Sequence, residues 1–148
     1  MHSELRFYLK NTRIMETLYK SKYYLIGYEE DNELIYYYHP PETVDITPDK
    51  YLQELQVFIK CALEYKPKVG LGDLRDFNFI ITPYIQEWID ENLFPAMQQI
   101  ALQKHAILLT PEFIVQLSVK QAIDESTEAS IKTKYFQDEP EARQWLLA

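Results

Sequence analysis

The sequence predicts a single α/β domain built on a mixed β-sheet. Two tyrosine-rich, β-prone runs, 23–28 and 34–38, flank a polar stretch and are typical of a β-hairpin. Behind them, segments with apolar residues at helical spacing alternate with short apolar runs. The expected order is β-β-α-β-α-β-α-β-α, with a sheet that is largely parallel in its second half and connected by crossover helices.

The expected helices share a start signal. Three of them follow a Thr-Pro pair, in which threonine can cap the first backbone N–H groups and proline suits the first helical position. The last one follows Asp138, with Glu141 three residues on, which is the pattern of a capping box. Pro95 falls inside the second helix and should kink or divide it. The expected helices are 48–65, 83–100, 111–123 and one that begins after residue 138.

The runs between these helices predict a short buried strand at 68–74, an apolar strand at 105–109 and a last strand at 131–136. The first of these runs contains Gly70 and Gly72. Glycine inside a strand often marks a place where another backbone or side chain comes close. We therefore expect a close approach onto the strand 68–74.

Composition limits the class of protein. A chain of 148 residues has the usual length of one domain, so 1–148 is taken as one domain with 1–13 as an N-terminal extension. The net charge of −8 repels phosphate backbones and argues against nucleic acid as a partner. Cys61 is the only cysteine, and no apolar run reaches the length of a membrane span. We expect a cytoplasmic protein without a membrane span.

Several stretches of the chain resemble a known family. They are G-D-L-R-D-F at 72–77, I-T-P at 81–83, F-P-A at 94–96, and Y-F-Q-D at 135–138 followed by E-A-R-Q-W-L at 141–146. Together they resemble STAS domains, and more closely the SpoIIAA-like, or STAS/SEC14-like, bacterial proteins of mostly unknown function. The resemblance covers about residues 14–147. It implies a STAS-type fold and a non-enzymatic regulatory or protein-interaction domain.

One feature of the classical family is not matched here. In its anti-sigma-factor antagonists, a serine of an Asp-Ser-Ser-Gly loop accepts phosphate from a partner kinase. Read onto this chain, Thr82 stands at the first serine and Pro83 at the phosphoacceptor, and neither the aspartate nor the glycine is present. The sequence therefore predicts no classical phospho-switch, and Thr82 is interpreted as a helix cap.

Polar residues gather at the end of the strand 68–74. Asp73, Arg75 and Asp76, with Thr82 beyond them, lie at the edge where open α/β sheets place their ligands. The two acids could bind a cation or act as acid and base, but Arg75 between them offers a ready ion pair, so a structural role is favoured. A hydrolase-type enzyme at this loop is the weakest alternative. The sequence carries no recognisable catalytic, cofactor-binding or metal-binding motif, and we expect no cofactor.

Tyrosine supplies the first functional hypothesis. There are 12 tyrosines in the chain, and alternation in the hairpin places Tyr24, Tyr28, Tyr36 and Tyr38 as candidates for an interface. We expect these residues to contact a protein partner or a second copy of the chain in a homodimer. The alternative is that tyrosine is simply suited to strands.

The second functional hypothesis is a small apolar, lipid-like ligand. The SEC14-like resemblance implies that some relatives hold apolar molecules between helices and sheet. Five side chains could line such a pocket in this chain, and they could equally fill a core. They are Phe77, Phe79, Trp88, Phe94 and Met97.

Overall fold

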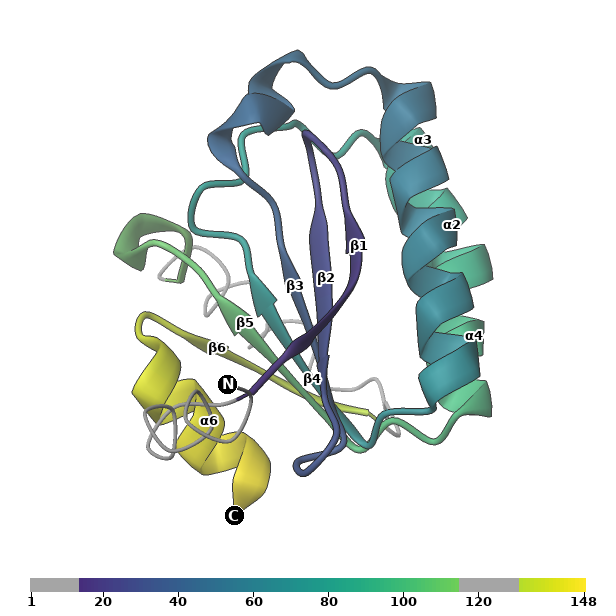
Figure 1. Cartoon of the computed structure of the whole chain (residues 1–148). Helices are drawn as coiled ribbons and strands as arrows, with labels where there is room; N and C mark the ends of the chain where they lie inside the picture. The colour runs from purple at the N-terminus through teal and green to yellow at the C-terminus, as the bar shows by residue number, and fades with distance from the viewer. Residues whose placement is uncertain (1–13, 115–130) are drawn as a thin grey trace, which may run out of the picture.

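The computed structural model describes residues 14–114 and 131–148. These residues form a six-stranded sheet in the order β1-β2-β3-β4-β5-β6, with helices on both faces (Figure 1). The first three strands are antiparallel and the last four, from β3 onward, run parallel. The predicted α/β class with a mixed sheet is confirmed. The strands are β1 (Glu16–Lys20), β2 (Leu25–Glu29), β3 (Leu34–Tyr38), β4 (Val69–Asp73), β5 (Lys104–Leu108) and β6 (Lys132–Phe136).

The helices divide between the two faces of the sheet. Figure 1 shows α2, α3 and α4 on one face and α6 on the other. A helix also begins at residue 111, as expected; the part of the predicted helix 111–123 beyond residue 114 lies outside the described residues, as does the extension 1–13. The helical elements are the 3-10 helix η1 (Pro41–Asp45), α2 (Pro48–Tyr65), α3 (Pro83–Trp88), the π-helix η2 (Ile89–Leu93), α4 (Phe94–Gln99) and α6 (Glu139–Leu147).

The predicted start signals act as caps, and Pro95 acts as predicted. The side chains of Thr47, Thr82 and Asp138 each accept a hydrogen bond from the backbone N–H three residues on. Just before Pro95 the helix widens into the π turn η2, in which the N–H of Phe94 bonds to a carbonyl five residues back. A proline lacks its own N–H and crowds the preceding turn, which explains why the helix divides there.

Strand β1 was not predicted, so the order begins with three strands and not two. The run E-T-L-Y-K has charged residues at both ends, and Thr17 is exposed, so it lacks the apolar character of strands β2 to β5. It pairs antiparallel with β2 and contains an irregularity between Thr17 and Tyr19. A short, polar, irregular strand is typical of a sheet edge.

The register of the hairpin places the four candidate interface tyrosines on different faces of the sheet, contrary to the expected common surface. Tyr28 lies opposite Ile35, whereas Tyr36 lies opposite Gly27, and directly paired residues share one face of a sheet. Tyr28 therefore faces helix α2, while Tyr36 and Tyr38 face the side of α6. Tyr24 and Tyr28 are also buried, with exposed fractions of 2% and 9%. The four tyrosines do not form a common surface, and two of them belong to the core.

Helix α6 is joined to the sheet by a buried ion pair. Nη1 and Nη2 of Arg143 lie 2.9 and 2.5 Å from the two carboxylate oxygens of Glu29 on β2, and Nε lies 2.7 Å from Glu139. The side chains of Arg143 and Glu29 are 6% and 1% exposed. Paired geometry of this kind is strong, and it compensates two charges that would otherwise be costly to bury.

We expect Arg143→Met to lower the free energy of unfolding by about 3–5 kcal/mol, because it leaves the Glu29 carboxylate buried without a cation. The double variant Glu29→Leu, Arg143→Met should recover most of that loss, since no charge remains to be compensated. Urea denaturation followed by circular dichroism measures both. A double variant as unstable as the single one would show that lost packing, and not an unpaired charge, is responsible.

Candidate functional site

A cavity of about 350 Å³ lies between the sheet and the helices α2, α3 and α4. This volume is at the lower end of the range for small-molecule sites, about 300–1,000 Å³. Most of its walls are aromatic or aliphatic, and none of the described residues that line it is a lysine, arginine, aspartate or glutamate. The aromatic and histidine side chains in the walls are Tyr24, Tyr37, His39, Tyr51, Phe58, Phe77, Phe94, His105 and Tyr135.

The floor of the cavity is a trough across strand β4. A Cβ atom at Gly72 would lie 2.1 Å from Cζ of Tyr37, so the tyrosine ring from β3 rests directly on this glycine. From β5 on the other side, His105 reaches over the same strand, and Tyr37 Oη lies 2.7 Å from His105 Nε2. The close approach predicted from the glycines is confirmed at Gly72. The Tyr37–His105 bridge spans the trough from one neighbouring strand to the other.

His39 contributes a buried polar group to the wall. Its ring is 2% exposed and stacks on Tyr24 with a centroid distance of 4.1 Å. Nδ1 lies 3.1 Å from the carbonyl oxygen of Tyr23, and because a carbonyl can only accept, Nδ1 carries the proton. Burial lowers the pKa of His39 to about 4. The imidazole is therefore neutral at pH 7, and its Nε2 is a hydrogen-bond acceptor.

Four further titratable side chains in the cavity walls have pKa values that keep them uncharged near pH 7. Burial lowers the pKa of His105 to about 4, so this imidazole is neutral as well. Burial raises the pKa of Tyr24, Tyr37 and Tyr51 well above the usual value for a phenol. All five groups hold no charge near pH 7. The cavity can hydrogen-bond a ligand but offers no ion to pair with one.

The predicted pocket residues separate into two groups. Phe77, Phe94 and Met97 line the cavity. Phe79 and Trp88 instead pack into a neighbouring hydrophobic cluster around helix α2. Sequence reasoning did not find Tyr37, His39 or His105, the polar residues of the site. The only signal for them was the pair of glycines, which indicates a close neighbour without saying which side chain it is.

The predicted polar loop lies apart from the cavity, and its groups are engaged with one another. Arg75 donates from Nε and Nη2 to the two oxygens of Asp73, at 3.0 and 2.8 Å, which is the expected ion pair. Tyr38 donates its hydroxyl to Asp76 at 2.6 Å, and Thr82 caps α3. Within the described residues, no three histidine, cysteine or acidic side chains gather in a way that could hold a metal ion.

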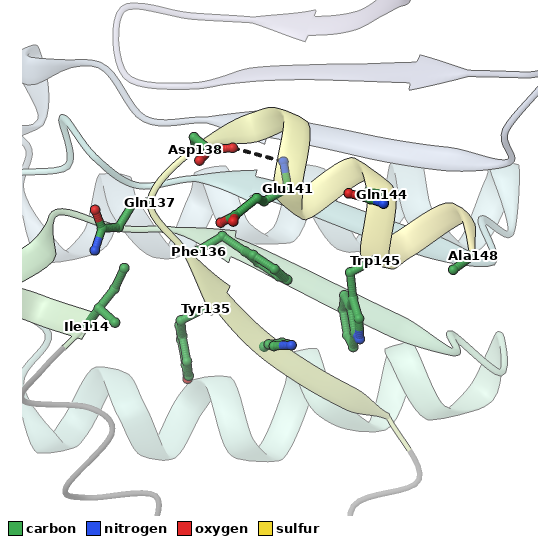
Figure 2. Close-up of a pocket in the computed structure, with 10 residues that line it drawn as sticks. Ile114, Tyr135, Phe136, Gln137, Asp138, Glu141, Gln144, Trp145 and Ala148 are labelled. Atoms are coloured by element: carbon green, nitrogen blue, oxygen red, sulfur yellow. Dashed lines mark hydrogen bonds between the residues drawn. The ribbon is translucent and has the colours of Figure 1, made fainter.

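A second hollow lies on the surface between the end of β6 and helix α6 (Figure 2). Trp145 and Phe136 form its apolar part, and Gln144 and Glu141 its polar part. Figure 2 shows the oxygen of Asp138 bonded to the backbone of Glu141, so the helix cap forms one wall. This hollow is larger and more open than the interior cavity, and the interior cavity is the better candidate for a binding site.

Comparisons with protein-family models, with curated proteins and with solved structures found no match to this chain. Across the described residues, none of the helices is long and apolar enough to cross a membrane.

The two glycines of β4 give a matched pair of variants. Gly72→Ala should lower the free energy of unfolding by about 1–3 kcal/mol, because the new methyl group displaces the Tyr37 ring. Gly70→Ala should leave stability unchanged or raise it by up to about 1 kcal/mol, since its Cβ would meet its nearest neighbour, His105, at an ordinary 3.5 Å. Chemical denaturation compares them. Equal losses in both variants would contradict the trough described above.

The two buried histidines predict a loss of stability in mild acid. A pKa of about 4 in the folded chain lies below the ordinary value of 6.5, so the unfolded chain binds the proton first as the pH falls. The contribution of the two neutral histidines to the free energy of unfolding should therefore be complete above pH 6.5 and should be lost as the pH falls from 6.5 to 4. A pKa shift of one unit corresponds to about 1.4 kcal/mol, so the titration of His39 should lower the free energy of unfolding by on the order of 3 kcal/mol over this range.

The measurement is the free energy of unfolding from pH 7.5 to 4 for the wild type and for His39→Asn. The variant should show a shallower decrease than the wild type over this range, because it lacks one of the two titrating groups. Parallel curves would show that His39 does not titrate as described.

Proposed function

We propose that this protein is a non-enzymatic binding domain that holds a small, uncharged, mostly apolar molecule in the cavity between its sheet and helices α2, α3 and α4. The observation that carries the proposal is the chemistry of the walls. They combine aromatic rings with a few neutral polar groups, Tyr37, His39 and His105 among them. Apolar walls with a small number of placed polar groups are the usual character of a small-molecule site.

The resemblance to STAS/SEC14-like proteins is part of this proposal. It implies relatives that hold apolar molecules between helices and sheet, and the cavity of this chain lies between those two layers. The order of elements after β1, in which a hairpin is followed by parallel strands and helices, agrees with the expected order.

Two other hypotheses have less support. The homodimer through the hairpin tyrosines loses Tyr24 and Tyr28 to the core, and the hydroxyl of Tyr38 is already bonded to Asp76. An enzyme at the polar loop would need Asp73 free to react, but Arg75 binds both of its oxygens. Ligand binding would use the cavity walls, including Nε2 of His39, which has no partner among the described residues.

Filling the cavity should weaken ligand binding without unfolding the protein. We expect Gly70→Val to place its side chain in the cavity, and β-branched residues suit strands. The variant should bind 2-methoxynaphthalene, a neutral apolar probe, at least tenfold more weakly than the wild type, as measured by calorimetric titration. Native mass spectrometry of gently purified wild type should also show any co-purified molecule, which Gly70→Val should lack.

Thr17→Val is the control, because it introduces the same residue type on the exposed strand β1, away from the cavity. It should bind the probe as the wild type does. Equal binding by Gly70→Val would place the probe elsewhere, and a wild type that neither binds the probe nor carries a co-purified molecule would refute the proposed function.

A further inference from the structure

We propose that the cavity selects a ring compound with a hydroxyl group, and that the hydroxyl donates a hydrogen bond to Nε2 of His39. This inference rests on the proposed function and names the class of ligand for the same site. His39 is then the residue that determines specificity, and the aromatic walls supply the apolar contact.

The hydrogen bonds of His39 determine which of its ring nitrogens can accept a hydrogen bond from a ligand. Nδ1–H donates a hydrogen bond to the carbonyl oxygen of Tyr23, so in the neutral ring Nε2 carries a lone pair. Among the residues that the structure describes, none bonds to Nε2, although the side chain is 98% buried and lines the cavity. The lone pair of Nε2 can therefore accept a hydrogen bond from a donor on a ligand in the cavity.

The rings around His39 favour a planar ligand and fix the direction of the bond. Tyr24 covers one face of the imidazole at 4.1 Å and nearly parallel, so the ring cannot tilt in that direction. Phe77 and Tyr51 lie at centroid distances of 4.8 and 5.8 Å. A ring compound that approaches Nε2 in the plane of the imidazole can contact these aromatic side chains at the same time.

The other polar pair in the cavity is already satisfied. The hydroxyl of Tyr37 and Nε2 of His105 bond to each other at 2.7 Å, whereas Nε2 of His39 has no partner among the described residues. The charge of the ligand is limited by the walls. An aliphatic amine would be protonated and a carboxylate ionised near pH 7, and the cavity has no ion to pair with either one. A hydroxyl is a strong donor without charge.

The test compares two probes that differ by one methyl group, 2-naphthol and 2-methoxynaphthalene, by calorimetric titration at pH 7. Only the naphthol can donate a hydrogen bond, and both are uncharged. The wild type should bind the naphthol at least tenfold more tightly, which corresponds to about 1.4 kcal/mol. The measured quantity is the ratio of the two affinities, which is insensitive to a general loss of stability.

Two variants of His39 remove Nε2 in different ways. His39→Asn keeps an N–H that can reach the Tyr23 carbonyl, and His39→Phe keeps a ring on Tyr24. The ratio of affinities should fall to about one in each variant, while Thr17→Val should keep the wild-type ratio. Either His39 variant can decide the matter if the other fails to fold.

The outcomes separate the inference from the proposed function. Equal affinities of the wild type for both probes would overturn the hydroxyl selection and leave a non-selective apolar cavity. A preference for the naphthol that persists in both His39 variants would overturn the role of His39. If the wild type binds neither probe, both this inference and the binding function proposed for the cavity are contradicted.

Discussion

The arrangement of this protein depends on a contact between a side chain and the face of strand β4 that carries only the glycines Gly70 and Gly72. Tyr37 lies across β4 because Gly72 has no Cβ, and His105 reaches toward it from β5 over the same strand. Side chains normally stand upright from a sheet. A bridge from β3 to β5 therefore requires that the strand between them, β4, has no side chain beneath the bridge on that face. The glycines of β4 have two effects. They allow the Tyr37–His105 hydrogen bond that links β3 to β5, and they leave open space above the centre of the sheet, where the cavity lies.

The sheet also separates charge from the cavity. Successive residues of a strand point to opposite faces, so Tyr28 enters the core below α2 while its neighbour Glu29 turns to α6 and meets Arg143. The ion pair is thereby kept on the face away from the cavity. The walls of the cavity on the other face include phenols and imidazoles, and burial keeps Tyr37, His39 and His105 neutral near pH 7. The buried acid on that side, Glu54 of α2, is not among the lining residues and bonds to Ser21 and Lys50. This division allows one domain to hold a buried salt bridge and an uncharged site without either disturbing the other.

The sequence predicts local structure well, because that structure depends on residues close together in the chain. It predicts poorly which residues of different elements meet in one site. The caps at Thr47 and Thr82 and the break at Pro95 are set by residues next to each other in the chain, and all three were predicted. Strand β1 was missed because its pairing with β2, and not its own composition, makes it a strand. The tyrosines of the hairpin were assigned to one surface because alternation gives two faces for each strand but not how the faces of two strands match. Register supplies that match, and it depends on the turn and on the core. The polar residues of the cavity come from β3, its end and β5, so no local pattern could bring them together.

The two glycines of β4 look alike in the sequence but have different explanations. At Gly72 a side chain would collide with Tyr37, so packing alone accounts for the glycine. At Gly70 an added Cβ would have only ordinary contacts, at 3.5 Å and beyond, and in the described residues no glycine has a positive φ that would favour it. Alanine in a strand is more favourable than glycine by roughly 0.5–1 kcal/mol, so packing and backbone geometry both favour a side chain at Gly70. A side chain there would occupy the cavity. The absence of one is therefore accounted for if the space itself has a use, and a bound molecule gives it one.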